Sequence, residues 1–358
     1  MAISRKASLL AGAAVITCLA APHARAQTTG TGAQTQVQEV VVTASRRSET
    51  VQNVAGEITA LTGTQLARQH AVNFNDFAAS VPGLSFQSNS PTNNLIAIRG
   101  VASSTAELGS AVSIYLDDVP LGASTQFGLG SQSFNFNLFD MDRVEVLNGP
   151  QGTLYGANAL GGAIKYETTP PKLGHYQATI EAEGSNTANG SDNGALRAMV
   201  NIPLGDQGAL RLDGLKSYDA GWTKDPTHGR TNVGSARDLG GRASLAYRIT
   251  PDLDVRITAF DQNIAASGQN LSFRNPKTGA PAAGAYNQSF ALEQPEDNTV
   301  QVYSGTINWN LDWAKVTSIS AYQRNQRLLP VRRQRVLRFP VALLHLRIFP
   351  IRNWPVSS

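Results

Sequence analysis

The sequence has almost no cysteine, and its one thiol lies in a segment that we expect to be removed. Cys18 stands in the apolar run 9–21, which follows a basic start and precedes an Ala24-Arg25-Ala26 cleavage site. This order is typical of a secretory signal peptide over residues 1–26. A mature chain without cysteine excludes disulfides and cysteine-based metal sites.

Long apolar runs and catalytic constellations are also missing after residue 26. No segment approaches the roughly 18 to 20 apolar residues of a membrane helix, so residence in a membrane would require β-strands. The five histidines lie far apart, and no Walker loop or Gly-x-Ser-x-Gly elbow is present. We therefore expect no metal site, no cofactor and no enzymatic activity.

Acidic residues are absent from residues 328–358, which contain six arginines and four prolines. The net charge of +4 comes from this tail and from the signal peptide, so the body of the chain is acidic. A nucleic-acid partner is therefore not expected. Because prolines do not belong in central strands, we interpret the tail as an aberrant, out-of-frame or foreign ending.

The most informative stretch runs from residue 112 to residue 169. Alternating residues predict a strand at 112–117 that ends in a turn at Pro120 and Gly122, and further strands at 143–147 and 163–168. The glycines between the last two strands are too many and too irregular for a helix. They predict positive φ angles or close approach of the backbone to another surface.

The string DMDRVEVLNGPQGTLYG at 140–156, continued by Gly-Gly-Ala-Ile at 161–164, resembles the plug-domain signature of TonB-dependent outer-membrane receptors. An apolar-Arg-Gly strand at 95–100 matches another element of that family. The resemblance implies that Arg143 and Glu145 pair with the barrel wall, although solvated surface charges are the simpler alternative. The residues that the resemblance marks as plug motif and plug–barrel contacts are Arg99, Gly100, Arg143, Glu145, Gly149, Gly152, Tyr155, Gly156, Gly161 and Gly162.

The mature chain begins with an uncharged Gln- and Thr-rich stretch, 27–38, which we expect to be disordered. The next residues are Glu39, Val40, Val41, Val42, Thr43 and Ala44. By themselves they favour an ordinary β-branched strand. The resemblance implies instead a TonB box within a disordered segment 27–47, which the energy-coupling protein TonB captures as an added strand.

Residues 48–170 predict a compact α+β plug domain. We expect a strand at 56–61, a helix at 65–70 capped by Thr64, and a helix capped by Asn73 that stops near Val81. From Pro170 onward the pattern changes to antiparallel strands joined alternately by short turns and long loops, which is typical of an outer-membrane barrel. The seven expected strands are 176–184, 195–204, 209–218, 239–249, 253–263, 299–311 and 313–325.

The size of the plug decides which barrel is implied. Eight strands enclose only side chains, whereas 22-stranded transporters hold a plug in the lumen. We therefore interpret residues 171–327 as part of an incomplete 22-stranded transmembrane β-barrel, and we expect this truncated chain not to transport alone. Aromatic residues that we expect near the bilayer surfaces are Trp222, Trp309, Trp313, Tyr247, Tyr303 and Tyr322.

The resemblance implies a receptor in the outer membrane of a Gram-negative bacterium that takes up a scarce ligand, most commonly a ferric siderophore. Its implied partners are TonB with the proton-driven motor of the inner membrane, outer-membrane lipid, and a small ligand such as an iron chelate. The ligand-contacting residues stay open. The alternative is a soluble periplasmic plug-like binding module without transport activity.

Overall fold

The computed structural model describes residues 41–43, 49–50, 52, 56–102, 111–121, 135–156, 158–272 and 274–328, and the backbone alone of residues 337–350 and Asn93. All of them belong to one compact unit, Glu39–Ser358. The expected signal peptide, the stretch 27–38, and Glu39, Val40 and Ala44 lie outside the described residues.

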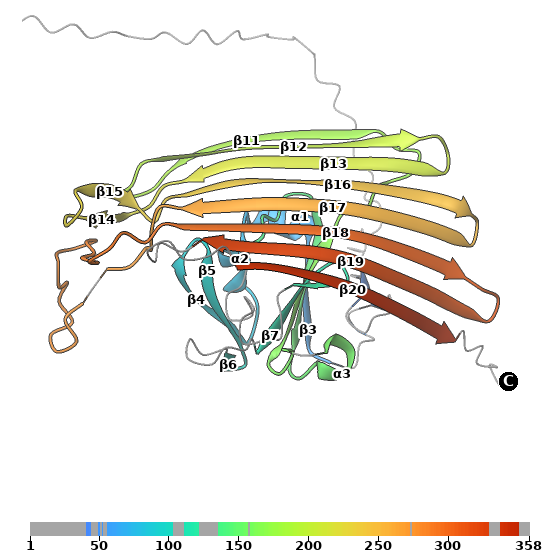
Figure 1. Ribbon diagram of the computed structural model, residues 1–358, viewed down its shortest axis with the longest axis horizontal. Helices are drawn as coiled ribbons and strands as arrows, with labels where there is room; N and C mark the ends of the chain where they lie inside the picture. The colour runs from blue at the N-terminus through green and yellow to red at the C-terminus, as the bar shows by residue number, and fades with distance from the viewer. Residues whose placement is uncertain are drawn as a thin grey trace, which may run out of the picture. The chain divides into compact units, whose positions relative to one another are not determined.

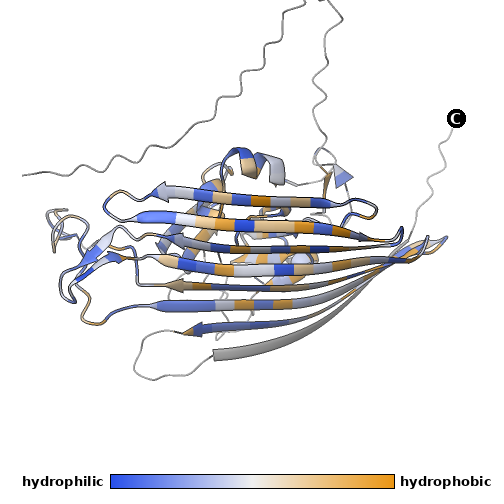
Figure 2. Cartoon of the chain, turned by 90° about the horizontal axis from the view of Figure 1, so that it is seen from above, coloured by the Kyte–Doolittle hydropathy of each residue, from blue (hydrophilic) through white to orange (hydrophobic). Residues whose placement is uncertain are grey.

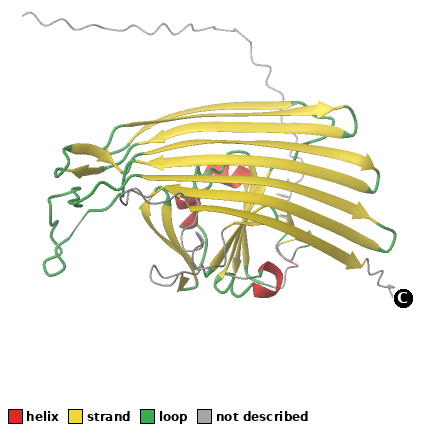
Figure 3. Cartoon of the chain, viewed as in Figure 1, coloured by secondary structure: helices red, strands yellow, loops and turns green. Residues whose placement is uncertain are grey.

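The first part of the chain, which we call the α+β region (described residues 41–169), contains three small sheets and three short helices (Figure 3). Its largest sheet has the order β3-β9-β10-β7-β8, in which β10 pairs parallel with β7 and antiparallel with β9. The elements are β1 (Val41–Val42), β2 (Glu49–Thr50), β3 (Ile58–Thr62), α1 (Gly63–Arg68), α2 (Phe74–Ala78), β4 (Leu84–Ser90), β5 (Asn93–Ile98), β6 (Val101–Ala102), β7 (Val112–Leu116), β8 (Val119–Leu121), β9 (Met141–Asn148), α3 (Gly152–Tyr155) and β10 (Gly162–Thr168).

Both longer helices of this region begin at a capping box. Asn73 caps α2 as the sequence predicts, and its side chain accepts a hydrogen bond from the amide of Asn75. Helix α1 begins two residues earlier than expected, because Thr62 rather than Thr64 caps it and Gln65 completes the box. These boxes satisfy amides that have no partner within the helix.

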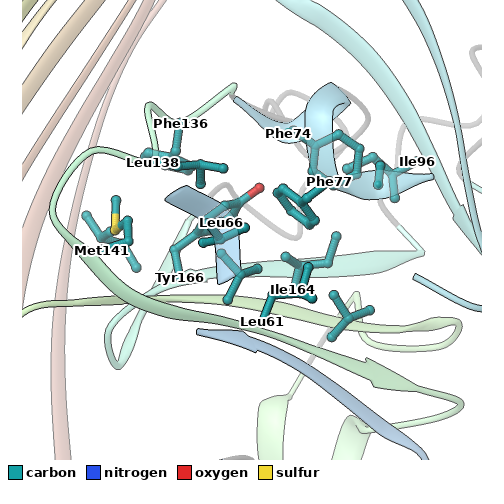
Figure 4. Packing of buried hydrophobic residues seen from close by; sticks show 14 of the residues in the cluster. Leu61, Leu66, Phe74, Phe77, Ile96, Phe136, Leu138, Met141, Ile164 and Tyr166 are labelled. Atoms are coloured by element: carbon teal, nitrogen blue, oxygen red, sulfur yellow. The ribbon is translucent and has the colours of Figure 1, made fainter. Parts of the chain in front are cut away.

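The core of the α+β region is apolar and contains many aromatic rings (Figure 4). Phe74 packs edge-on against Phe77 and Phe86, with ring centroids 5.2 and 5.6 Å apart. Phe136 contacts Tyr166 at 5.0 Å and also Phe260, at 5.7 Å, from a later strand. The core therefore continues into the second part of the chain.

The hairpin of β7 and β8 corrects the expected turn at Pro120. The chain reverses at Asp117-Asp118, where Asp117 has φ 51°, and Pro120 lies within β8. Strand β8 is at the edge of its sheet, where a residue without an amide hydrogen is tolerated.

The second part is one antiparallel sheet of eight strands, which we call the wall, in the order β11-β12-β13-β16-β17-β18-β19-β20 (Figure 1). All seven expected strands are present and most are longer than expected. The strands are β11 (Gln177–Asn186), β12 (Asp192–Leu204), β13 (Gly208–Asp219), β16 (Ala236–Thr250), β17 (Leu253–Ala266), β18 (Glu296–Asn310), β19 (Ala314–Leu328) and β20 (Leu337–Pro350), and a separate hairpin is formed by β14 (Thr223–Asp225) and β15 (Arg230–Val233). Short turns at 205–207, 251–252 and 311–313 alternate with the long connections 220–235 and 267–295.

Strand β20 corrects the interpretation of the tail as residues outside the β pattern. Residues 337–350 pair with β19 from Arg327↔Leu337 to Ala314↔Pro350. Two prolines fit because β20 is an edge strand of the described sheet, so one side of its backbone has no strand to donate to.

The wall places its apolar side chains outside and many polar ones inside. Hydrophilic and hydrophobic residues alternate along its strands (Figure 2). On strand β17, for example, Ile257 is 57% exposed whereas its neighbour Thr258 is buried. Among the described residues, no helix is long and apolar enough to span a membrane.

Candidate functional site

The glycine-rich loop between β9 and β10 is closed by its own backbone. The amide of Gly149 donates to the carbonyl of Gly161 at 2.9 Å, and that of Gln151 donates to Ala159 at 2.8 Å. Gly149 and Gly156 have φ angles of 90° and 68°, as the sequence predicts. The prediction of no helix is wrong for one turn, because α3 (Gly152–Tyr155) lies within the loop.

The adjacent glycines at the end of the loop allow close packing. A Cβ atom on Gly162 would lie 2.2 Å from the carbonyl oxygen of Leu147, and one on Gly161 would lie 3.1 Å from Val101. Any larger residue at 162 would therefore push β10 away from β9.

Arg99 and Gly100 form the turn from β5 to β6, with φ angles of 52° and 77°. The amide of Arg99 donates to the carbonyl of Gly83 at 2.7 Å, and its guanidinium pairs with Glu57. Glu57 also accepts a hydrogen bond from Asn148 at the end of β9. The apolar-Arg-Gly element thus joins the second small sheet to the signature strand.

Four charged side chains, Arg143, Glu145, Lys165 and Glu167, form a cluster that we call the quartet. They are cross-strand neighbours, because β9 and β10 pair Glu145 with Lys165 and Arg143 with Glu167. Arg143 donates to Glu145 at 2.7 Å, and Lys165 pairs with Glu167. Glu145 is completely buried and Lys165 is 3% exposed.

The quartet keeps its buried members charged. Burial favours the neutral form of Glu167, but attraction to Lys165 and Arg143 outweighs it and lowers the pKa of this carboxyl. Burial likewise opposes the charge of Lys165, but attraction to Glu167, Asp118 and Glu145 raises its pKa well above the usual range. The quartet is therefore two cations and two anions held together.

The expected pairing of Arg143 and Glu145 with the wall is corrected by these contacts. Among the described residues, the ion-pair partners of Arg143 are Asp142, Glu145 and Glu167, all within the α+β region. Strands β9 and β10 point these side chains toward Thr43 of the first strand segment.

Contacts with the wall come instead from residues that the sequence analysis did not select. Asp140, which starts the signature, accepts hydrogen bonds from Arg211 of β13 and Arg242 of β16. Arg242 also pairs with Asp213 at 2.7 Å. The side chains of Asp140, Arg211 and Arg242 are at most 6% exposed, so this is a buried ion network.

Two further contacts fix the α+β region on the wall. Asp117 accepts hydrogen bonds from Thr168 and lies 3.6 Å from Arg256 of β17. Ser90 donates at 2.9 Å to Glu296 of β18, which also pairs with Arg327 of β19 at 3.1 Å. Arginines at inward-facing positions of expected strands were the available sequence signal, but only the fold supplies their carboxylate partners.

Comparison with known proteins gives this geometry a family. The model of the TonB-dependent Receptor Plug Domain matches residues 50–163. A pesticin receptor of Yersinia pestis is 29% identical over 230 residues, which are 62% of this chain and 31% of the relative. This chain belongs to the TonB-dependent receptors.

Other similarities cover both parts of this TonB-dependent receptor chain. An iron-regulated outer membrane virulence protein of Vibrio cholerae is 26% identical over 66% of this chain and 36% of the relative. The solved ferric yersiniabactin uptake receptor of Yersinia pestis has a TM-score of 0.67 at 21% identity, over 84% of this chain and 46% of that one. The ferripyoverdine receptor of Pseudomonas aeruginosa has a TM-score of 0.64 at 17% identity, over 85% and 39%.

These structural similarities establish the fold: a plug domain followed by antiparallel strands of a receptor barrel. The α+β region is called the plug from here on. The chain spans about a third of the length of the curated relatives that it matches and less than half of the solved structures. The described wall is an open sheet with β11 and β20 at its edges.

Proposed function

We propose that this chain supplies the plug and part of the barrel wall of an outer-membrane receptor that takes up a ferric siderophore, driven through TonB. The names of its relatives, which include a ferric yersiniabactin uptake receptor and a ferripyoverdine receptor, support this substrate class. We infer binding and movement, and no bond chemistry in the protein.

One observation carries the proposal: the wall is polar toward the plug and apolar on its other face. Buried polar side chains on the plug side include Arg211, Arg242 and Gln262, each at most 5% exposed. On the opposite face, Ile180 is 77% exposed and Leu196 is 56% exposed. Such an inversion is unfavourable in water and favourable when the outer face meets lipid.

Aromatic residues on the wall support the same placement. Trp309 and Trp313 lie beside the short turn 311–313, and both are exposed. Tyr303, six residues before Trp309 on β18, lies against Tyr322 of β19 with ring centroids 6.3 Å apart. Six residues span roughly 20 Å along a strand, which is close to the height of about 25 Å expected for the apolar band.

Trp222 is not part of these belts. It lies in the long connection between β13 and β14, and its ring meets that of Tyr286 edge-on at 6.0 Å. Among the six expected girdle residues, this one supports a loop rather than a bilayer surface.

The segment 39–44 remains our proposed TonB box. Its described residues lie on the plug, where β1 (Val41–Val42) pairs with β2. The exposed backbone edge of an extended segment is what a partner protein needs to add a strand.

Transport requires a closed wall. Edge strands leave backbone groups without partners, and in lipid each unsatisfied group costs several kcal/mol. We therefore propose that these eight strands act only together with further strands that join β20 to β11.

Fractionation tests the proposal. The chain should be recovered with outer membranes and should migrate differently on gels before and after heating, as folded barrels do. A soluble protein that proteolysis trims to the plug would instead support a periplasmic binding module. The apolar outer face of the wall argues against that alternative, because it would be exposed to water.

Uptake itself is tested with a completed barrel. Joined to the missing strands of a relative, the chain should support accumulation of a radiolabelled iron chelate that stops when TonB is deleted. Accumulation that is unchanged in the absence of TonB would contradict the proposed energy source.

A further inference from the structure

The described part of the proposed TonB box is bound to the plug. Val42 is completely buried in a cluster with Tyr115, Leu147 and Tyr155. Tyr155 belongs to the glycine-rich loop, and its ring packs edge-on against that of Tyr115 at 5.0 Å. The plug thus offers an apolar pocket to the side chain at position 42.

The next residue inserts into the quartet. The amide of Thr43 donates to Glu145 Oε1 at 2.9 Å, and its hydroxyl donates to Glu167 Oε1 at the same distance. The same hydroxyl oxygen accepts from Lys165 Nζ at 2.8 Å and from Arg143 Nη2 at 3.2 Å. One small side chain therefore contacts all four charged residues.

We propose that the quartet and the pocket around Val42 form a docking site for the chain's own β1 segment, which must open before a partner strand can pair there. The amide of Thr43, which an added strand would engage, is occupied by Glu145 in the docked state. Strand β2 already uses one backbone edge of β1. The identity of the partner rests on the proposed function, but the docking site does not.

The docked state is not fully satisfied. Glu145 is buried, and its Oε2 atom has no hydrogen-bond partner among the described residues. A buried carboxylate oxygen without a donor destabilises the arrangement that contains it. The docking site therefore holds the segment without being an optimal fit, so release needs less than the contacts alone would suggest.

The reactivity of a thiol at the buried position tests this inference in the full chain in detergent. Cys18 is replaced by Ser and Val42→Cys is introduced, so that a water-soluble maleimide reports how often the segment opens. Adding Thr43→Val, which keeps the shape but removes the hydroxyl, should raise the labelling rate about tenfold, because hydrogen bonds to charged groups are lost.

Thr50→Val is the matched control. Thr50 lies in β2, and its hydroxyl is buried without a hydrogen-bond partner among the described residues. This change should leave the labelling rate within a factor of two. Equal rates in the Thr43→Val variant and its parent, or an equal increase from Thr50→Val, would overturn the docking site.

Hydrogen exchange guards against an effect of the cysteine itself. With Val42 intact, the amide of Thr43 should exchange about tenfold faster in Glu145→Gln than in the parent, and unchanged exchange would contradict the proposal. Binding of the carboxy-terminal domain of TonB is measured separately. If the thiol results hold and this domain binds no variant, the docking site stands and the TonB partner is rejected.

Discussion

The plug and the wall of this chain bury opposite kinds of side chain. The plug encloses an apolar core in which Phe74 and Phe77 are at most 1% exposed. The wall exposes residues such as Ile180 and Ile257 and buries Arg211, Arg242 and Gln262 against the plug. One chain therefore follows the rule for water in its first part and the rule for lipid in its second.

This contrast explains how the plug is held. A purely apolar interface would fix it permanently in the wall. Instead Asp140, Asp117, Ser90 and Thr92 meet charged residues of the wall, and apolar contacts such as Phe136 with Phe260 are fewer. Buried ion networks are specific in geometry, but they contribute less net stability than apolar packing of the same volume.

The largest expected effect breaks the plug–wall network. Asp140→Asn leaves Arg211 and Arg242 buried with only part of their compensating charge, and removing one partner of such a pair costs about 3–5 kcal/mol. We expect the plug to become protease-sensitive at lower urea concentration in the detergent-solubilised chain.

Asp142→Asn is the control for that change. It lies two residues further along, and its side chain is 45% exposed where it pairs with Arg143. An exposed pair contributes about 0–1 kcal/mol, so the urea dependence should hardly move. Similar losses from both variants would show that the network with the wall is unimportant.

The next effect sharpens the difference between lipid and water. Ile257→Lys on the outer face of the wall should cost about 2–4 kcal/mol, because a cation would lie in the apolar band. Refolding into lipid vesicles, measured over a urea series, reports this loss.

Leu154→Lys is the matching change on the plug. Leu154 in α3 is 43% exposed, similar to many wall residues, but it faces water in our proposal. The expected change is within about 0.5 kcal/mol. A tolerated Ile257→Lys would mean that the wall does not contact lipid at this position.

A smaller effect concerns the helices of the plug. Asn73→Ala removes the side-chain oxygen that caps α2 and should destabilise the plug by about 1 kcal/mol. Asn73→Asp keeps a capping oxygen and should retain most of the stability, which urea unfolding of the two variants can compare.

The smallest expected effect is a pH dependence of the quartet. The folded pKa of Glu167 lies below its ordinary value of 4.5, so ionised Glu167 stabilises the fold above that value. This stabilisation is lost as the pH falls from 4.5 toward the lower folded pKa. Glu167→Gln should flatten this part of the stability curve, and an unchanged acid slope would contradict it.

The sequence indicated the wall better than the plug contacts. Strict alternation in β12 and β17 and short turns at Thr250-Pro251-Asp252 define strands without knowledge of their neighbours. Strand β20 was missed because its prolines and arginines mask the strand pattern, and only its place at an edge makes it compatible with a sheet.

The plug motif was found by resemblance, and its roles were assigned only partly. The positive φ angles of Gly149 and Gly156 and the close packing of Gly162 follow from the need for glycine. The partners of Arg143 and Glu145 did not follow, because the register of β9 and β10 decides that these side chains meet Lys165, Glu167 and Thr43 rather than the wall.

The sequence by itself determined the kind of protein: a plug signature followed by alternating strands, because periodicity and glycine requirements are local properties of the chain. Only the tertiary structure decided which charges meet. Asp140 lies 71 residues before Arg211, and Thr43 lies 102 residues before Glu145. No local pattern encodes such pairs, since their distance depends on how the sheets are stacked and in which register their strands pair.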